Sequence, residues 1–293
     1  MRRRQLDPRL VHGTGPGGRI VEADVKSVVG EVSSAAAPIK PGVSGVSTAL
    51  QKPAPMPGQK LGVSLMRRAI AERTALSFST VPHFYLRSEV DVTPLVEVRQ
   101  QLLPLIQKET GAKLTLTDFV LRAMGKALAE FPRANSIWQK DAIVTFSNVD
   151  LGLVVGLPDG LLIPLLRNVD KLTLAEIVKQ RSELVAAARA GQLPVEAMEG
   201  GAVSLSNLGV GAVDEFAPVI AHPQSSMLAM GCAAPRPFVV DGKLATRTTI
   251  RLCLAVDHRV MDGAPAGEML GRIVELIQQP AALVREGASL AFE

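Results

Sequence analysis

The sequence predicts an α/β domain in which helices pack on a mostly antiparallel or mixed sheet. Two observations support this prediction. Apolar runs of strand length alternate along the chain with segments whose apolar residues recur at helical spacing. Hydrophobic residues make up 47% of the 293 residues and aromatic residues only 3%. A sizeable core built from aliphatic side chains is therefore expected.

The helices of this domain are predicted from their caps and their apolar period. Ser64 and Thr173 are the expected N-caps of two of them. Thr93 followed by Pro94 fits the start of a third, in which Pro104 is expected to produce a kink. Five helices are predicted: Ser64 to Arg73, Thr93 to Lys108, Thr117 to Glu130, Thr173 to Ala190 and Ala264 to Gln278.

The strands are predicted from short apolar runs between turn residues. Asp241-Gly242 is a hairpin signal, with apolar residues on both sides of it. Pro158-Asp159-Gly160 separates two further runs in the same way. The predicted strands are Pro82 to Val92, Val149 to Leu157, Leu161 to Leu166, Phe238 to Val240, Leu244 onward and Thr248 to Val256.

The first 60 residues differ from the rest in composition. A glycine-rich loop at residues 12–19 leads into a short predicted helix from Val21 to Val29. A phosphate-binding loop is the weaker interpretation, because no strand precedes the glycines. Residues 31–60 are rich in Ala, Pro and Ser and indicate a flexible linker. The expected organisation is a small helical module at 1–30, a linker at 31–60 and a large domain at 61–293.

Bulk properties exclude several classes of function. The net charge is only +4, and no basic cluster interleaves with aromatic residues, so nucleic-acid binding is not expected. No apolar run reaches the roughly 18–20 residues of a membrane span. Cys232 and Cys253 have no paired spacing and are expected to be buried, reduced thiols in a reducing compartment. No cluster of His, Cys and carboxylate residues predicts a metal site.

One segment near the C-terminus predicts chemistry. An apolar strand ends at Asp257-His258, and Asp262-Gly263 follows four residues after the histidine. Only four His occur in the chain, and an imidazole at a strand end is a candidate general base at neutral pH. The alternative is a structural histidine followed by a turn-forming Asp-Gly.

Other motifs accompany this one in a fixed order. They are Val81-Pro82-His83-Phe84, Glu89 to Thr93, Ser204-Leu205-Ser206-Asn207-Leu208-Gly209 and Ala217 to Gln224. With these motifs, residues 61–293 resemble the dihydrolipoamide acyltransferases of 2-oxo acid dehydrogenase complexes. Residues 12–25 resemble the peripheral subunit-binding domain of the same proteins, without part of its first helix. The resemblance implies a chloramphenicol-acetyltransferase-like two-layer sandwich with a mixed sheet.

The resemblance also implies roles for individual residues. His258 would be the general base, and Ser206 would donate to the oxyanion and contact the cofactor, with Ser204 as the nearby competitor. Asp262 would act on His258 directly or be tied to Arg67, for which Arg68 is the alternative. Arg99 and Thr115 would contact coenzyme A. His83 is expected to be structural.

The implied reaction moves an acyl group, acetyl by preference, between dihydrolipoamide and coenzyme A. Succinyl and branched-chain acyl groups stay as alternatives. The lipoyl group is expected from a domain absent from this chain. A homotrimer that builds a larger cubic or dodecahedral core is expected. The N-terminal module would bind dihydrolipoamide dehydrogenase, the 2-oxo acid decarboxylase component, or both.

Two other functions are weighed against this one. The first is a free-standing chloramphenicol-type acetyltransferase, which would need neither a subunit-binding module nor a linker. The second is a non-catalytic scaffold component, which would not need His258, Asp262 and Ser206. The expected compartment is the bacterial cytoplasm, with the mitochondrial matrix as the alternative.

Overall fold

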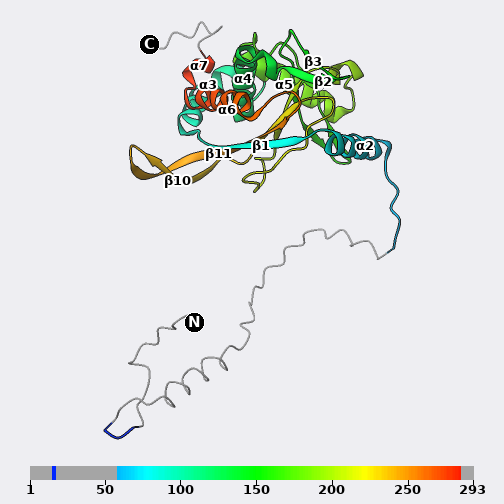
Figure 1. Ribbon diagram of the computed structural model, residues 1–293. Coiled ribbons are helices and arrows are strands. Elements are labelled where there is room, and N and C mark those ends of the chain that lie inside the picture. Colours follow the sequence, from blue (N-terminus) through cyan, green and yellow to red (C-terminus); the bar gives the residue numbers. More distant parts are fainter. Residues whose placement is uncertain (1–14, 18–57, 285–293) are drawn as a thin grey trace. The chain divides into compact units, whose positions relative to one another are not determined.

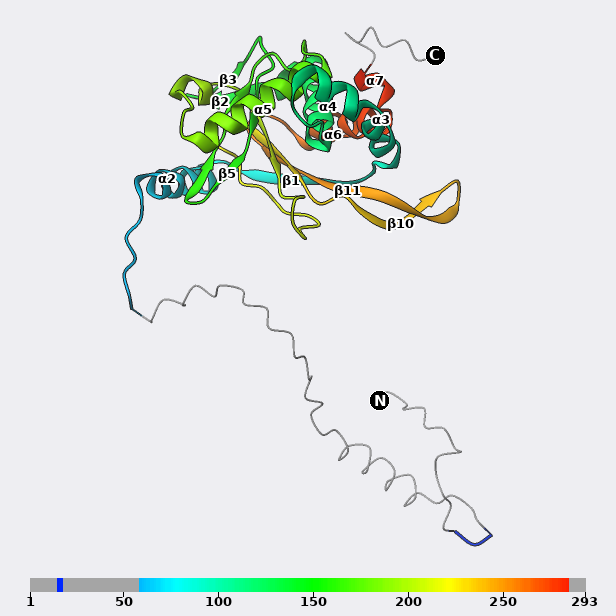
Figure 2. The same ribbon diagram turned by 180° about the vertical axis from the view of Figure 1, so that it is seen from behind.

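A computed structural model describes residues 15–17 and 58–284 of the chain (Figures 1 and 2). The chain divides into two compact units, Met1–Lys60 and Leu61–Glu293. The predicted helix from Val21 to Val29 and the predicted linker as far as residue 57 lie outside the described residues. The fold below is that of the larger unit.

The larger unit has two layers, with α3, α4, α5 and α6 on one side of a sheet (Figure 1). The main sheet has the order β1-β11-β9-β8-β4-β7, and β10 pairs with β11 beside this path. β8 runs parallel to β9 and β4, whereas the other pairs are antiparallel. The predicted α/β fold with a mixed sheet is therefore confirmed.

The helices are α2 (Leu65–Thr80), α3 (Thr93–Thr110), α4 (Leu116–Glu130), α5 (Leu174–Ala190), α6 (Gly263–Gln278) and α7 (Ala281–Val284). The strands of the main sheet are β1 (His83–Asp91), β4 (Leu151–Leu153), β7 (Leu165–Leu166), β8 (Val203–Asn207), β9 (Ser226–Met230), β10 (Ala234–Val240) and β11 (Lys243–Asp257). Two hairpins are separate: β2 (Ser136–Gln139) with β3 (Ala142–Thr145), and β5 (Val155–Leu157) with β6 (Gly160–Leu162).

One predicted cap and one predicted helix start are wrong. Thr93 is not a cap: Val92 is the N-cap of α3, and the Thr93 hydroxyl accepts a hydrogen bond from the backbone N–H of Thr248. This bond ties α3 to β11 instead of closing the helix end. α4 begins at its N-cap Thr115, two residues before the predicted start, because Asp118 completes a capping box with Thr115.

One predicted helix end is also wrong. α2 runs to Thr80 instead of Arg73, since no Gly or Pro interrupts the chain before Pro82. The predicted caps Ser64 and Thr173 are confirmed, and their side chains accept from the backbone N–H groups of Arg67 and Glu176.

The two faces of the sheet have different chemistry, which follows from the alternation of side chains along each strand. Leu252 and Leu254 of β11 and Leu205 of β8 belong to the main hydrophobic core, on the side of the helices. Arg251 and Cys253 therefore point to the opposite face. We call this second side the open face. The segment from residue 208 to 224 crosses it, since Glu215 pairs with Arg87 and Ile220 donates to His83.

A stability prediction follows from the two capping boxes of the helical layer. The Asp118 carboxylate is fully buried, accepts from Thr115 and pairs with Arg181 at 2.5 Å. Asp118→Ala should reduce the free energy of unfolding by roughly 3–5 kcal/mol, because it leaves a buried cation and a cap unpaired. Denaturant unfolding followed by circular dichroism measures this loss.

The matched control is Glu176→Ala in the capping box of α5. Glu176 is exposed, and its carboxylate accepts from the backbone N–H and the hydroxyl of Thr173, so its removal should cost about 0.5–2 kcal/mol. Equal losses for the two variants would contradict the role given to the buried Asp118–Arg181 pair.

Candidate functional site

His258 lies at the end of β11, directly after the last paired residue of the strand. Its backbone N–H donates to the Pro82 carbonyl at 3.0 Å. Its ring packs on Phe84 with 4.6 Å between ring centroids, and 52% of the side chain is exposed. Nδ1 lies 3.6 Å from Oδ1 of Asp262, which is ion-pair distance but too long for a hydrogen bond. Nδ1 therefore faces Asp262, and Nε2 has no hydrogen-bond partner among the described residues.

The predicted partner of Asp262 lies elsewhere in this chain. The Arg67 guanidinium donates to the Asp159 carbonyl at 3.2 Å and so anchors α2 to the turn between β5 and β6. The Asp262 side chain is 82% exposed and is the N-cap of α6 without a side-chain capping bond. Within one chain, the expected Arg67–Asp262 pair is not formed among the described residues.

Ser206 and Ser204 both lie on β8 but differ in their partners. Ser204 is fully buried and its hydroxyl donates to Oε1 of Gln224. Ser206 is 8% exposed, and among the residues that the structure describes its hydroxyl has no hydrogen-bond partner. Ser206 thus has a free donor, whereas the Ser204 donor is already used.

The residues predicted to contact coenzyme A gather near Ser206, at the start of α4. Asn207 follows Ser206, and its side-chain amide donates to the Thr117 hydroxyl at 2.9 Å. Thr115, two residues before Thr117, donates to the Asp118 carboxylate. Nε of Arg99 donates to the carbonyl of Leu114 at 3.0 Å. Asn207 therefore joins the end of β8 to the start of α4, where Thr115 lies and Arg99 bonds. The Ser206 side chain itself alternates with Leu205 and Asn207 and points to the other face of the sheet.

His258 does not belong to this group. Ser206 pairs with Ala229 of β9, which pairs with Cys253 of β11. His258 lies five residues beyond Cys253 along β11. With about 3.3 Å per residue and about 4.8 Å between strands, Ser206 and His258 are separated by roughly 19 Å.

The two side chains also lie on different sides of the sheet. The His258 ring packs on Phe84, which packs against the main core. Leu205 belongs to this core, so its neighbour Ser206 faces the open side. One chain thus carries a histidine half-site and a serine half-site that cannot meet. The histidine half-site consists of His258, Asp262 and Phe84. The serine half-site consists of Ser206, Asn207, Thr115 and Arg99.

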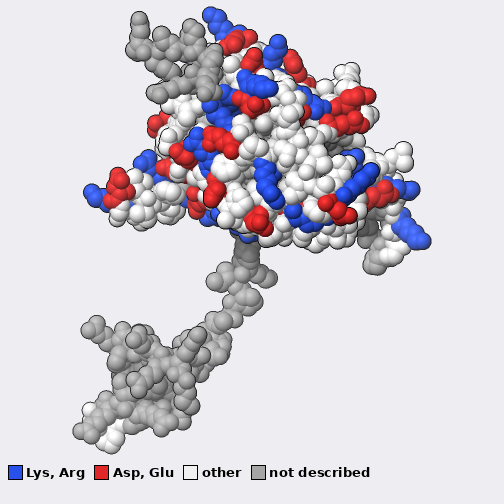
Figure 3. Space-filling view, turned by 45° about the horizontal axis from the view of Figure 1, so that its top comes forward, with Lys and Arg blue, Asp and Glu red and all other residues white. Residues whose placement is uncertain are grey.

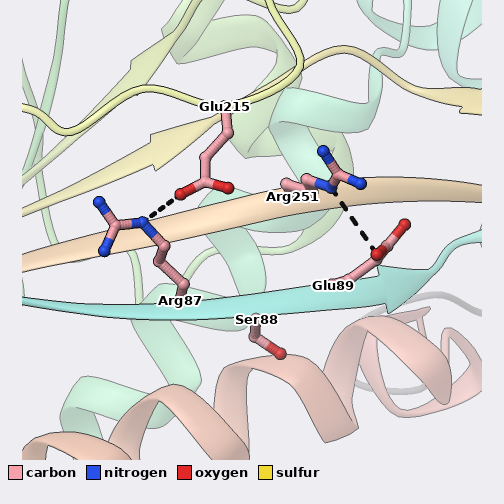
Figure 4. A pocket seen from close by; sticks show the side chains of 5 residues that line it. All are labelled: Arg87, Ser88, Glu89, Glu215 and Arg251. Atoms are coloured by element: carbon pink, nitrogen blue, oxygen red, sulfur yellow. Dashed lines mark hydrogen bonds and ion pairs between the residues drawn. The ribbon is translucent and has the colours of Figure 1, made fainter. Parts of the chain in front are cut away.

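A hollow of about 210 Å³ lies on the open face (Figure 4). In Figure 4, Arg87 points toward Glu215 and Arg251 toward Glu89, while Ser88 points to the helical side. The two ion pairs leave the hollow without net charge. It contains neither His258 nor Ser206, so we do not assign it as the catalytic centre.

The remaining predicted groups are structural. Nδ1 of His83 donates to the Val81 carbonyl at 2.7 Å, and Nε2 accepts from the Ile220 N–H at 3.1 Å. Both ring nitrogens are used, so the structural role predicted for His83 is confirmed. Cys232 and Cys253 are free thiols; Cys253 is buried, and its burial raises the pKa of its thiol. Cys232 is only half-buried, so the prediction that it is buried is wrong.

Two features are absent from residues 15–17 and 58–284. No helix there is both long and apolar enough to cross a membrane. No group of three or more His, Cys, Asp or Glu side chains in these ranges could hold a metal ion.

Residues 57–285 match the family model of the 2-oxoacid dehydrogenases acyltransferase (catalytic domain). The chain therefore belongs to the 2-oxoacid dehydrogenase acyltransferase family, and its larger unit is the acyltransferase domain. Residues 1–26 match the model of the e3 binding domain, mostly outside the described residues.

Curated relatives agree with this assignment. The chain is 34% identical over 280 residues to the dihydrolipoyllysine-residue acetyltransferase component of the acetoin cleaving system of Bacillus subtilis, with 95% of this chain and 67% of the relative covered. It is 32% identical to the corresponding component of the pyruvate dehydrogenase complex of Rickettsia bellii, with 94% and 63% covered. The chain thus spans about two thirds of the length of these relatives.

Solved structures show the same fold. A probable dihydrolipoamide acetyltransferase of Listeria monocytogenes aligns with a TM-score of 0.74 at 32% identity, covering 80% of this chain and 98% of that one. The dihydrolipoamide acetyltransferase of Azotobacter vinelandii aligns with a TM-score of 0.74 at 30% identity, covering 83% and 99%. The fold of the larger unit is therefore that of the dihydrolipoamide acetyltransferases.

The two serines of β8 give a prediction that needs no assay of function. Ser204→Ala should reduce the free energy of unfolding by about 1–3 kcal/mol, because it leaves the buried Gln224 amide without its donor. Ser206→Ala should change it by less than about 0.5 kcal/mol, because no protein bond is lost. Chemical denaturation of both variants decides this, and a larger loss for Ser206→Ala would show that its hydroxyl has a structural partner.

Proposed function

We propose that this chain transfers an acyl group, acetyl by preference, between dihydrolipoamide and coenzyme A as the core component of a 2-oxo acid dehydrogenase complex. One observation carries the proposal. The catalytic mechanism of the A. vinelandii enzyme was investigated at a serine, a histidine and an asparagine. The same number of residues separates its serine from its histidine as separates Ser206 from His258, and its asparagine has the position of Asp262.

His258 would act as the general base. A free thiol has a pKa near 8.5, so little thiolate is present at neutral pH. Nε2 of a neutral His258 would accept the thiol proton as sulfur attacks the thioester carbonyl. The new C–S bond makes a tetrahedral oxyanion, which collapses by breaking the original C–S bond. The departing sulfur takes the proton from His258, so the base is restored.

Ser206 would stabilise the oxyanion. Its hydroxyl is nearly buried and has no hydrogen-bond partner among the described residues, so it can donate without first breaking a bond. A fixed donor of this kind stabilises the transition state more than the substrate, because the negative charge develops only during attack. Arg99 and Thr115, in the same half-site, would contact coenzyme A.

Because one chain separates the two half-sites, we propose that each complete site forms between two copies of the chain. Apolar side chains at the start of the domain support an interface: Leu61, Leu65 and Phe78 are 66%, 85% and 69% exposed. In a trimer with threefold rotational symmetry, three copies of one such contact form a closed ring. One solved relative, also with a TM-score of 0.74, is the cubic core of a pyruvate dehydrogenase complex, which favours trimers that assemble further.

The partners are proposed from the small N-terminal unit and the relatives. The match of residues 1–26 to the e3 binding domain supports binding of dihydrolipoamide dehydrogenase, the decarboxylase component, or both. The lipoyl group would arrive on a separate domain. Acetyl is preferred because the first two relatives are acetyltransferase components. A B. subtilis branched-chain component, 32% identical, keeps branched-chain acyl groups as the alternative.

A kinetic prediction tests the proposal with free dihydrolipoamide and acetyl-coenzyme A. The wild-type protein should form S-acetyl-dihydrolipoamide, and His258→Ala should remove nearly all of this activity because no other group takes the proton. Ser206→Ala should lower kcat by roughly 10²–10³. The KM should change much less, since the lost bond forms in the transition state.

Ser204→Ala is the control, and its kcat per folded protein should stay close to wild type. No exchange by the wild type with acetyl or branched-chain donors would contradict the proposed function. His258→Ala activity within tenfold of wild type would contradict the assignment of the base.

A further inference from the structure

Two residues that flank His258 make contacts that reach beyond the strand end. The Asp257 side chain is only 2% exposed. Its carboxylate accepts from the backbone N–H of Arg259 at 3.0 Å and from two nitrogens of the Arg259 guanidinium, Nε at 3.0 Å and NH2 at 2.7 Å. Such a two-point pair fixes the relative orientation of both side chains as well as their distance.

The same guanidinium continues to a second element. Its central carbon lies 5.6 Å from the ring centroid of Trp138 on β2, which is the range of a cation–π contact. β2 and β3 form their own two-stranded sheet, separate from the strands that carry the two half-sites. Because Arg259 directly follows His258, this contact connects the strand end that carries His258 to a different hairpin.

The His258 side chain itself has few contacts. Its ring touches Phe84, faces Asp262 and is otherwise half exposed. The direction of the ring consequently depends on the backbone at residue 258, which lies between the two members of the ion pair. The backbone of the next residues is held as well, since the Val260 carbonyl accepts from Nε of Arg133 at 3.0 Å.

We propose that Asp257, Arg259 and Trp138 form a clamp that holds the strand end and thereby sets the position of the His258 imidazole. Arg259 and Trp138 are then positioning residues for acyl transfer, and neither touches the substrate. The hydrogen bonds from Asp257 raise the pKa of the Arg259 guanidinium, so Arg259 stays charged in the clamp. The proposal rests on the proposed function for its kinetic consequence but not for its structural one.

The test compares Arg259→Ala, Arg259→Lys, Trp138→Ala and Trp138→Phe in the full chain. Arg259→Ala should lower kcat by roughly 10–100-fold, because a shift of about 1 Å at a catalytic group has effects of this size. KM values for dihydrolipoamide and acetyl-coenzyme A should stay within about threefold, since binding contacts are untouched. Arg259→Lys should recover part of the loss, because lysine keeps the charge without the two-point geometry.

The aromatic partner should behave in the same way. Trp138→Phe keeps an aromatic face under the guanidinium and should stay close to wild type, while Trp138→Ala should lower kcat. If the residues act as one unit, the double variant Arg259→Ala with Trp138→Ala should be no slower than the worse single variant.

Two readouts need no activity. Trp138 is the only tryptophan of the chain, so its fluorescence reports the contact directly. Arg259→Ala should shift the emission maximum and increase quenching by acrylamide. The rate at which diethyl pyrocarbonate modifies His258, measured by peptide mass spectrometry, should change several-fold.

The matched control is Arg272→Ala. Arg272 has similar exposure, 32% against 29%, and pairs with Glu130 and Glu275 on the surface of the helical layer. It should leave kcat, emission and the modification of His258 unchanged. Circular dichroism and the mass of the assembled protein identify variants that fail to fold. Where an alanine variant fails to fold, the conservative variants Arg259→Lys and Trp138→Phe provide the test of the clamp.

Three results would overturn the clamp. They are a kcat of Arg259→Ala within twofold of wild type, a rise of KM at constant kcat, and unchanged Trp138 emission and His258 modification in folded Arg259→Ala. A wild-type protein without exchange activity would instead overturn the proposed function. In that case the emission of Trp138 and the modification rate of His258 still decide the clamp.

Discussion

The register of the main sheet is the constraint on which the site depends. β8, β9 and β11 are paired so that Ser206, Ala229 and Cys253 form one row across the sheet. His258 lies beyond the far end of β11 and packs on the helical side. His258 could approach Ser206 only if β11 slipped by several residues along β9. Such a slip would expose the buried leucines of its core face. The distance between the two half-sites is therefore fixed by the same packing that forms the hydrophobic core.

This separation explains features that look incomplete in one chain. Ser206 keeps a nearly buried hydroxyl without a partner in the described part of the chain, and Asp262 is exposed although it belongs to the most specific motif. Exposed apolar side chains also gather where α2 begins. Each feature is costly or unexplained in an isolated domain. Each is accounted for if a second copy brings its histidine half-site to the serine half-site of the first.

Much of the fold could be predicted from the sequence because it is encoded locally. The Thr173 cap and the Asp241-Gly242 turn are short-range signals, and both are present in the structure. Asp241 and Gly242 have φ of 50° and 75°, the left-handed pair that a two-residue hairpin turn requires. The predicted start of α4 is two residues too late. Thr117 is as good a cap as Thr115 by residue type, and only the capping box with Asp118 selects Thr115.

The strands that carry Ser206 and its neighbour were not predicted. β8 and β9 are only five residues long, and β9 shows no alternation of apolar and polar residues. Two serines in or beside these strands bond to distant residues: Ser204 of β8 donates to Gln224, and Ser225, just before β9, donates to the Ser136 carbonyl. Partners of this kind are set by tertiary contacts, so spacing alone does not reveal them.

The candidate site, like the fold, could be predicted from the sequence only in part. The motifs identified His258 and Ser206, and the structure distinguishes Ser206 from Ser204 by the free hydroxyl. The sequence gives no sign of the link from Arg259 to Trp138, because the two residues are distant in the chain and neither lies in a recognisable pair. It likewise gives no distance between the half-sites, which depends on strand order.

The most direct test of a divided site is complementation between two inactive proteins. His258→Ala and Ser206→Ala proteins are mixed in equal amounts under conditions that allow subunit exchange, and acetyl transfer is measured after reassembly. If each site takes its histidine from one copy and its serine from another, random assortment makes about a quarter of the sites intact. Activity should then rise toward about a quarter of the wild-type value. If activity stays at the level of the unmixed variants although exchange is shown by mass, every chain holds its own complete site and the account is wrong.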